Sequence, residues 1–575
     1  MLLTRKKILF LFFLSICYNF SNAQNNNAGT FSGNLESNGN FFQEDVRIGA
    51  TQTPQYDHQL FGADAWVDLK YSNFGFDFGL RFDLFNNSNL LNPQDSYNDQ
   101  GIGRWFVKKK VNKLGISAGY LYDQIGSGII FRSFEQRPLL IDNALMGVRL
   151  TYDIAPDWEI KGFTGRQKNL FDLYESVIRG GSIDGFIASD SSNWSIAPGF
   201  GVVTRTIDDE TMNSLVSTLS TYSAVDRIGA KYNAYALTVY NTLTAGPINW
   251  YVEAAYKTNE TLWDPLAKKT NLNGTTSLGK FIFDSGTVFY SSLGYAGNGF
   301  GVTLDLKRTE NFSFRVNPFE IENRGAINFL PPMTRVNTYR LNARYSPATQ
   351  ELGEQAMQLD LSYSPSRKWS FLLNISSIQT LKDRSGNSVS FNPFASDESL
   401  LYKEIYTEVS YKYKRKWQLL AGVQFQNYNQ EIYEGKADVD ILETLTPYLE
   451  YLYKFDRKKS VRIEAQYMIT APGISDYTNR DLGDWVFAQV EVGIAPHWIF
   501  TISDMYNIDP YRKNLEPGET AEKIHYPTLG VVYIQRSNRF DLRYVKQVEG
   551  IVCAGGICRL EPAFSGVKMS VTSTF

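Results

Sequence analysis

The sequence predicts an all-β protein whose strands close into a single transmembrane antiparallel β-barrel. Three features predict it: long segments of alternating apolar and polar residues, tight turns followed by Trp, and a final strand that ends at Phe575. Phe, Tyr and Trp make up 14% of the residues, which suits the aromatic girdles of a membrane barrel. At roughly 23 residues for each strand with its connection, we expect about 24 strands, within a range of about 22 to 26.

The clearest alternation lies between Phe74 and Phe85, where every second residue is apolar over a length that suits a tilted membrane strand. A helix would scatter these Phe and Leu side chains around its circumference. A strand of a soluble β-sandwich could alternate in the same way, but such strands usually run for about 5 or 6 residues. The alternation recurs along the chain, at 65–71, 114–122, 146–153, 302–307, 357–363, 461–467 and 486–494.

Four tight turns are each followed directly by a Trp that lies on the same face of the expected strand as the apolar residues after it. These are Trp158, Trp369, Trp417 and Trp498. An indole is apolar with one polar N–H, so a ring of outward Trp side chains suits the membrane–water interface. The alternative is that each Trp covers the open end of a soluble sheet. Because the register repeats at four turns, we interpret these residues as an interfacial girdle.

The connections at the opposite strand ends are long, which is the outer-membrane pattern of short periplasmic turns and long external loops. We expect the longest of them at 168–225, a stretch rich in Gly, Ser, Asp and Thr. Such a loop stands outside the membrane or folds into the lumen. Residues 309–356 show no clear strand order. Because strands begin near Phe31, we expect one barrel domain over 24–575, without an N-terminal plug domain.

An export signal is predicted over residues 1–23. Three basic residues precede an apolar run at 8–16, and small residues then indicate cleavage before Gln24. The run is shorter than the about 20 residues that a membrane-spanning helix needs. Lipidation of Cys17 is the alternative, but Ile16 stands where a small residue is expected. We therefore predict a mature chain in the outer membrane.

The charge of the mature chain is mild. Cleavage removes three of the 57 basic residues and no acidic one, which leaves 54 against 60 and a formal charge of −6. No basic stripe stands out along the sequence, so we predict no nucleic-acid partner.

The final strand places Val567, Met569, Val571 and Phe575 on one face. A strand that ends in Phe resembles the signal read by the barrel-assembly machinery, although a soluble strand can end in Phe too. The predicted partners are membrane lipid, that assembly machinery and other outer-membrane proteins.

The mature chain has two Cys residues, Cys553 and Cys558, on either side of a Gly pair before the final strand. The Gly pair allows a tight reversal, and export brings the thiols to an oxidising compartment, so we predict a disulfide. Metal binding is the alternative, but it needs two more ligands and no His lies nearby. We predict no cofactor and no metal.

His is scarce, with His58, His497 and His525 alone in the chain. No nucleophile motif surrounds them, so we predict that the protein is not an enzyme. The alternative, an outer-membrane hydrolase, would place one His within hydrogen-bond reach of a Ser and a carboxylate.

A dense group of charges contains Arg132, Glu135, Arg137, Asp142 and Arg149. Arg132 and Glu135 cannot both face lipid without a large free-energy cost, so we place the group in the lumen. One interpretation is a charge cluster that narrows a pore or holds an inward loop. The other is an ion-pair network that only anchors the loop.

Two segments carry a resemblance to a known family. They are Gly128–Leu145, which reads GIIFRSFEQRPLLIDNAL, and Cys553–Arg559, which reads CAGGICR. Together they resemble an uncharacterised family of large outer-membrane barrel proteins. The resemblance implies the location and the fold, and it brings no activity and no site residue with it.

Two functional hypotheses follow for such a barrel. The first is a porin-like passive channel or transporter for small solutes, because about 24 strands enclose a wide lumen unless something fills it. The second is a non-catalytic structural or assembly subunit of an outer-membrane complex, whose long loops form the docking surface. Conductance favours the first, and stoichiometric partners favour the second.

Overall fold

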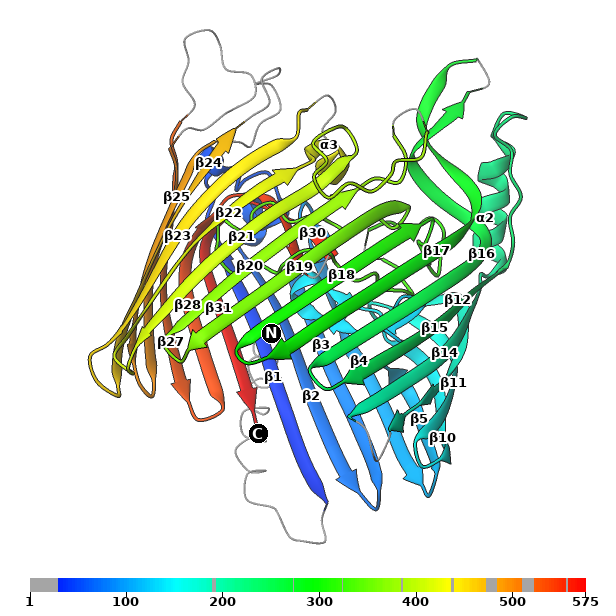
Figure 1. Ribbon diagram of the computed structural model, residues 1–575, viewed down its shortest axis with the longest axis horizontal. Coiled ribbons are helices and arrows are strands. Elements are labelled where there is room, and N and C mark those ends of the chain that lie inside the picture. Colours follow the sequence, from blue (N-terminus) through cyan, green and yellow to red (C-terminus); the bar gives the residue numbers. More distant parts are fainter. Residues whose placement is uncertain are drawn as a thin grey trace, which may run out of the picture.

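The computed structural model describes residues 29–188, 193–271, 274–322, 324–383, 386–435, 439–471, 483–508, 522–554 and 557–575. Its wall is one closed antiparallel barrel of 24 strands (Figure 1), which confirms the predicted fold class and strand number. The short β13 pairs with β14 beside β12 and adds no further wall position. The predicted signal peptide over 1–23 lies outside the described residues.

The wall strands of the first half of the chain come in sequence order. They are β1 (Thr30–Phe42), β2 (Phe61–Asn73), β3 (Phe76–Ser88), β4 (Tyr97–Val111), β5 (Leu114–Leu121), β10 (Leu145–Ala155), β11 (Trp158–Asn169), β12 (Asp172–Gly185) with β13 (Ile187–Ala188), β14 (Trp194–Thr206), β15 (Asn233–Ala245), β16 (Ile248–Thr270) and β17 (Thr276–Gly297).

The second half continues in the same way. Its wall strands are β18 (Phe300–Glu310), β19 (Gly353–Ser366), β20 (Trp369–Gln379), β21 (Leu400–Tyr413), β22 (Trp417–Tyr428), β23 (Leu442–Lys454), β24 (Lys459–Ala471), β25 (Trp485–Ile494), β26 (Trp498–Asn507), β27 (His525–Gln535), β28 (Asn538–Gln547) and β31 (Phe564–Thr574). Helical turns η2 (Val46–Ile48), η3 (Gln55–Gln59) and η4 (Arg137–Leu139), helices α2 (Asp209–Ser220) and α3 (Gln430–Glu434), and hairpin β29–β30 (Gly550–Ala554, Ile557–Glu561) lie in the connections.

The barrel closes where the first and last strands pair. β1 runs antiparallel to β31, and the Gly33 N–H donates to the Phe575 carbonyl at 2.7 Å. The Phe575 N–H donates back to the Gly33 carbonyl at 3.0 Å. Closure leaves the sheet without a free edge. The backbone N–H and C=O groups of every strand can then pair with a neighbouring strand, as a lipid environment requires.

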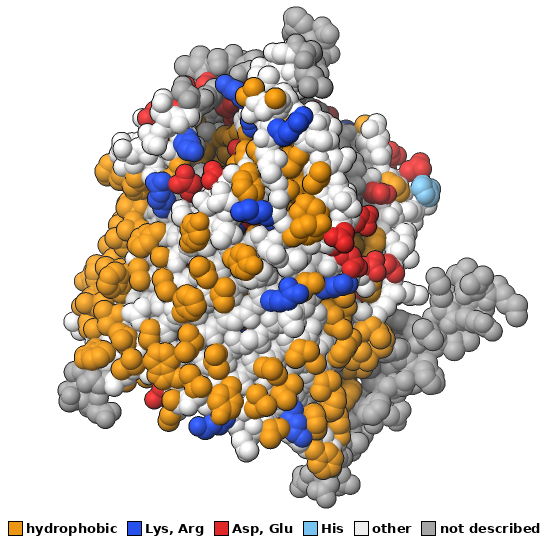
Figure 2. Space-filling model, turned by 90° about the vertical axis from the view of Figure 1, so that its right-hand side faces the viewer, with side chains coloured by type: hydrophobic (Ala, Val, Ile, Leu, Met, Phe, Trp, Pro, Cys, Tyr) orange, Lys and Arg blue, Asp and Glu red, His pale blue; other side chains and the backbone are white. Residues whose placement is uncertain are grey.

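The outer surface is apolar. Along β10, Val148, Leu150, Tyr152 and Ile154 are 44–47% exposed, whereas the Arg149 side chain between them points inward and is 22% exposed. Figure 2 shows hydrophobic side chains spread over the lower and middle part of one face, with most charged side chains above them. An apolar outer face, with charged side chains such as Arg149 turned inward, is the reverse of a soluble protein's surface and matches a barrel in lipid.

The short turns lie at one end of the barrel and the long connections at the other. The four Trp residues predicted as a girdle are the first residues of β11, β20, β22 and β26, and each follows a short turn. Trp369 contacts Tyr411 with ring centroids 4.6 Å apart, and Trp498 contacts Tyr533 at the same centroid distance, both in tilted geometry. The girdle's position at a membrane interface stays a prediction.

Residues 168–225, which we expected to form the longest loop, contain β12, β14 and α2, so this prediction was wrong. Gly180, Gly185 and Gly199 lie in strands, and at each of them an aromatic ring of a neighbouring strand occupies the adjacent space. A Cβ on Gly185 would lie 2.7 Å from the Trp158 ring, and one on Gly199 would lie 2.0 Å from the Tyr240 ring. Gly marks close approach here, not a turn.

Three connections fold into the lumen. They are the entry loop (residues 43–60), the first strap (122–144) and the second strap (311–352), which is the longest connection between wall strands. Their apolar residues form two buried clusters with inward side chains of the wall. The hydrophobic core of the molecule therefore lies inside the barrel. Among the described residues, no helix has the length and apolar character needed to cross a bilayer.

The register of the β29–β30 hairpin places Cys553 directly opposite Cys558. Directly opposed residues of antiparallel strands have Cα atoms about 4.5–5.5 Å apart, inside the range that a disulfide bridges. The side chains of both residues lie outside the described part of the structure. The disulfide stays a prediction with a suitable backbone.

We expect the tryptic peptide that ends at Arg559 to carry an intramolecular disulfide in the purified protein. Peptide-mass mapping without reductant should find it lighter by two hydrogens than after reduction. The variant Cys553→Ser should expose a reactive thiol at Cys558. A peptide that reacts fully with an alkylating reagent before reduction would contradict the disulfide.

Candidate functional site

The first strap closes part of the lumen with two chemically different parts. Its short elements are β6 (Asp123–Ile125), β7 (Phe131–Ser133), β8 (Glu135–Gln136), η4 and β9 (Ile141–Asp142). Ile129 and Ile130 in its first part are completely buried in one of the apolar clusters. The later part, residues 134–143, is named the charged segment because its ionic side chains meet β1, β2, β3 and β11.

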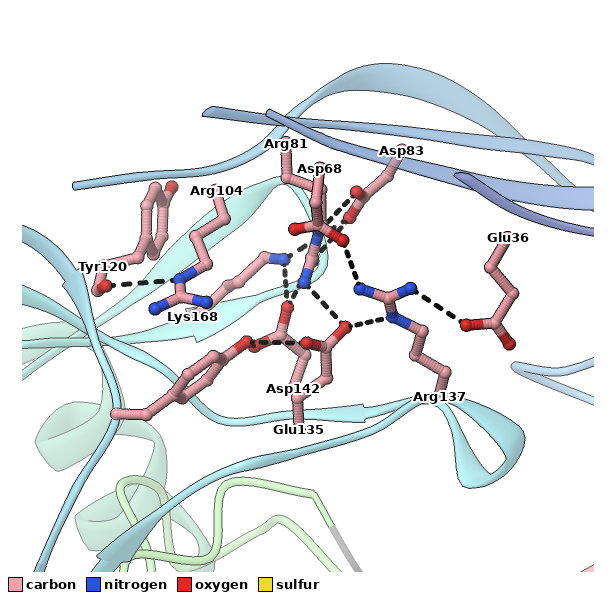
Figure 3. A network of polar contacts seen from close by, with 11 residues as sticks. Glu36, Asp68, Arg81, Asp83, Arg104, Tyr120, Glu135, Arg137, Asp142 and Lys168 are labelled. Carbon is pink, nitrogen blue, oxygen red and sulfur yellow. Dashed lines mark hydrogen bonds and ion pairs between the residues drawn. The ribbon is translucent and has the colours of Figure 1, made fainter. Parts of the chain in front are cut away.

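Arg81 on β3 is the centre of a network that joins the charged segment to the wall (Figure 3). Its Nε and Nη2 donate to the two Asp83 oxygens at 2.6 and 2.7 Å. Its Nη1 donates to Glu135 at 2.6 Å, and Nη2 also donates to Asp142 at 2.7 Å. Arg81 is only 1% exposed. One guanidinium therefore binds three carboxylates, and its planar fork suits this arrangement.

Arg137 extends the network from the charged segment to two more strands. Its Nε donates to Glu135 at 2.8 Å, its Nη1 to Glu36 of β1 at 2.9 Å, and its Nη2 to Asp68 of β2 at 2.6 Å. Glu135 is thus shared by a wall arginine and a strap arginine. Sharing fixes the relative position of strap and wall, since moving one ion disturbs the others.

Asp142 is the second carboxylate that strap and wall share. Lys168 of β11 donates to it at 2.5 Å, and the Tyr122 hydroxyl donates to it at 2.7 Å. Burial by itself raises the pKa of Asp142, but Lys168 and Arg81 outweigh burial and hold this pKa below its ordinary value. Asp142 is therefore ionised at neutral pH.

The structure brings three of the five predicted cluster residues, Glu135, Arg137 and Asp142, into one network. The other two lie elsewhere. The Arg132 guanidinium lies over the Phe134 and Phe329 rings, 4.8 and 4.2 Å from their centroids. Arg149 pairs with Asp123 at 3.1 Å, beside Lys161, which reaches the same carboxylate at 2.9 Å.

Sequence analysis missed the wall side of the network. Its members are Glu36, Asp68, Arg81, Asp83 and Lys168. A usable signal was present, because Arg81 and Asp83 stand two residues apart on the polar face of the clearest alternating strand. An ion pair on the luminal face of one strand marks a place where an inward loop can be fixed.

The second strap spans the lumen from β12 to β24. At one side Ser176 donates to the Val316 carbonyl at 2.7 Å. At the other side the Leu341 N–H donates to the Gln466 side chain at 2.7 Å. Because β12 and β24 are far apart around the barrel, this strap bridges opposite walls.

The two straps are hydrogen-bonded to each other. The Arg132 N–H donates to the Ile327 carbonyl at 2.9 Å, and the Phe329 N–H donates to the Gly128 carbonyl at 3.0 Å. Beside the charged segment remains a cavity of only about 40 Å³, lined by Arg81, Glu135 and Asp142 among others. A water needs about 10–15 Å³ of such space, so this cavity has room for water and is too small for a solute.

The His residues take part in no catalytic constellation within the part of the chain that the structure describes. His58 contacts Asp57, His525 contacts Asp504 at 2.6 Å, and His497 contacts the Ile534 carbonyl at 2.7 Å. None of these contacts includes a Ser. The same described residues contain no group of three or more His, Cys, Asp or Glu side chains that could hold a metal ion.

The sequence model of the protein family DUF6029, which is described as a family of unknown function, matches residues 4–575. The chain belongs to this family. The resemblance inferred from two segments of the sequence, to a family without established activity, is therefore confirmed. No curated protein matches the chain.

Solved structures with a similar arrangement include transport proteins. The siderophore receptor PirA from Pseudomonas aeruginosa is 9% identical, with 96% of this chain and 81% of that chain covered and a TM-score of 0.38. The ferric citrate transporter FecA is 9% identical, with 96% and 80% covered and a TM-score of 0.41. OccAB2 from Acinetobacter baumannii is 9% identical, with 73% and 97% covered and a TM-score of 0.32.

Replacing Arg81 by Met should strongly destabilise the protein. The change leaves three carboxylates without their common partner, and an uncompensated buried ion typically costs about 3–5 kcal/mol. The free energy of unfolding in urea, measured in detergent micelles, tests this. The control Arg47→Gln breaks a pair whose arginine is 59% exposed and should change little. Equal effects of the two substitutions would contradict the network's importance.

The stabilising effect of Asp142 should depend on pH. Its pKa in the folded protein lies below the ordinary 3.8, so its contribution is fully present above that value and is lost as pH falls through the folded pKa. The unfolding midpoints of the native protein and Asp142→Asn should differ by a constant amount at neutral and mildly acidic pH. They should converge only below pH 3.8. Convergence already near neutral pH would contradict the lowered pKa.

Proposed function

We propose that the protein is an outer-membrane transporter for a small solute, with a lumen that is closed at rest and opens by movement of the charged segment. The apolar outer face, the closed barrel and the predicted export signal support the location. One observation carries the gate: the charged segment seals the sector beside β1–β3 by ionic contacts, whereas apolar clusters fill much of the rest of the lumen.

The chemistry of the seal decides where opening is easiest. Exposing an apolar cluster to water costs a free energy of about 25 cal/mol for each Å² of apolar surface that becomes accessible. Ions that separate into water regain their hydration, so a buried ion pair contributes much less net stability than its short distances imply. The charged segment is therefore the part of the closure that can leave the wall at the lowest free-energy cost.

The orientation belongs to the same proposal. Short turns at one end and long connections at the other support a periplasmic position for the turns and an external position for the connections. The closing pair of β1 and β31 ends at Phe575, which we propose as the residue recognised by the barrel-assembly machinery. The straps then close the channel from its external half.

Planar-bilayer conductance should separate a gated transporter from an open passive channel. We expect the native protein to conduct little, and the variant Glu135→Gln with Asp142→Asn to open, because it removes both carboxylates that tie the charged segment to Arg81 and Lys168. The matched control Asp57→Asn with Glu175→Gln changes carboxylates whose side chains are 77% and 62% exposed and should stay closed.

Two results would refute the gate. Steady conductance of the native protein would favour an open porin. A network variant that is folded, by its heat-modified gel migration, and yet never conducts would favour a permanently closed barrel.

A permanently closed barrel would suit the second candidate function, a structural or assembly subunit. One observation favours it: β16 and β17 have 23 and 22 residues and extend beyond the other strands near α2 (Figure 1). Leu266 and Leu278 near the end of this hairpin are 61% and 65% exposed. Shortening the hairpin should then release a stoichiometric partner in mild-detergent purification, without any change in conductance.

A further inference from the structure

Three Tyr side chains meet on the luminal side of β21 and β23. Tyr406 and Tyr448 lie on these strands, stacked with ring centroids 5.7 Å apart, and Tyr339 of the second strap lies 4.4 Å from Tyr448. The Tyr406 hydroxyl donates to Glu408 at 2.7 Å, and the Tyr448 hydroxyl lies 3.2 Å from the same carboxylate. We call Tyr339, Tyr406, Tyr448 and Glu408 the tyrosine patch.

The wall is shaped for these rings. Gly422 of β22 lies between the two Tyr-bearing strands, opposite Tyr448. A Cβ on Gly422 would lie 2.3 Å from the Tyr448 hydroxyl oxygen. The ring can lie flat across β22 only because this position is Gly, so the backbone and the patch are matched to each other.

Carboxylates outnumber cations around the tyrosine patch. A single arginine, Arg462, lies 3.3 Å from Glu450, 3.6 Å from Glu464 and 3.3 Å from Glu491. Glu408 accepts hydrogen bonds from Tyr hydroxyls, with no Lys or Arg in ion-pair distance among the described residues. Solvent reaches this wall, since the Arg462 and Glu491 side chains are each 32% exposed.

A deeply buried carboxylate stands next to the patch on the same face of β21. Glu404 is 0% exposed, and its Oε1 accepts from Asn337 at 2.9 Å and from Gln424 at 2.5 Å. Its Oε2 accepts no hydrogen bond of good geometry within the described part of the chain, although the Tyr402 side chain lies beside Glu404. A buried anion without a partner is unfavourable unless positive charge or a donor approaches it.

The second strap already places one cation on the patch. The Arg335 guanidinium lies over the Tyr406 ring, with its Cζ 4.0 Å from the ring centroid. This is a cation–π contact, in which the negative face of the ring attracts the cation. Three carboxylates, Glu408, Glu450 and Glu464, lie near Tyr339, so this group stays net negative even with Arg335 and Arg462 counted.

We propose that the tyrosine patch binds a solute with a guanidinium or ammonium group, and that Arg335 occupies the position of this group in the resting protein. Tyr406 and Tyr448 are 1% and 4% exposed, so the solute reaches their rings as Arg335 moves away. As a statement about the transported solute, this inference rests on the proposed transport function, but binding can be measured without transport.

The chemistry excludes the other simple solute classes at this site. An anion would meet the uncompensated carboxylates and be repelled. A neutral solute could donate a hydrogen bond to a carboxylate, but it would gain neither the ion pair nor the cation–π contact. An organic cation gains both.

The test is calorimetric titration of the full-length protein in an uncharged detergent with butylguanidinium chloride, and with butylurea as a neutral probe of the same shape. We expect the native protein to bind the cation and not the urea. Glu408→Gln should weaken binding about ten- to a hundredfold, because it replaces a charged acceptor of the cation by a neutral one. Arg335→Gln should tighten binding, since it removes the internal competitor.

Matched variants separate the site from general attraction to an acidic lumen. Glu159→Gln makes the same charge change on β11, on the far side of the barrel, and should leave the affinity unchanged. Tyr406→Phe keeps the ring and should retain binding, whereas Tyr406→Leu should lose it.

Equal affinity for butylguanidinium and butylurea would overturn the proposal, as would equal weakening by Glu159→Gln and Glu408→Gln, or weaker binding in Arg335→Gln. If Glu408→Gln fails to fold, the Arg335→Gln comparison decides the matter alone, because it changes a strap side chain and leaves every wall side chain in place. Absence of conductance in the folded Glu135→Gln, Asp142→Asn variant would refute the gate and would leave this binding result unchanged.

Discussion

The width of the barrel is the constraint on which the rest of the structure depends. A closed sheet of 24 strands encloses more space than its own inward side chains can fill. The chain meets this constraint with its own connections, since the entry loop and both straps enter the lumen and form buried clusters there. The outer face is in contact with lipid by our proposal, so the lumen is the one place where a hydrophobic core can form.

The contents of the lumen differ from one sector to another. Ile129 and Ile130 of the first strap and Phe312 and Phe314 of the second are completely buried against the wall. Beside β1–β3 the same first strap instead offers Glu135, Arg137 and Asp142. Since apolar packing is lost on exposure to water while ions are rehydrated, these neighbouring sectors have different stabilities against opening. A single strap can therefore be fixed at one end and separable at the other.

The wall strands could be predicted from the sequence because alternation with period two is a local signal. The Phe74–Phe85 segment and the Trp-led strands needed no knowledge of distant residues. The loop expected over 168–225 was wrong because its Gly-rich composition was interpreted as loop-forming. The rings that need the space beside Gly185 and Gly199, those of Trp158 and Tyr240, lie on other strands.

The contents of the lumen were much harder to predict than its wall. The partners of the second strap, such as Gln466 for Leu341, are 125 residues away in the chain. For the same reason only the strap residues of the ionic network were predicted. The wall residue Arg81 is 54 residues away from its partner Glu135. Local patterns identify which residues face the lumen, but the pairing of those residues depends on how the straps cross it.

The charged segment and the tyrosine patch lie on opposite parts of the wall, so a common role needs a physical connection between them. The second strap provides one. Its Ile327 and Phe329 are hydrogen-bonded to the first strap, and its Arg335, a few residues later, lies on Tyr406. Coupling between distant sites is carried by such contiguous contacts when an element has two arrangements. A solute that displaces Arg335 therefore acts on the same strap that holds the first strap in position, and solute binding would favour opening by the difference in its affinity for the two arrangements.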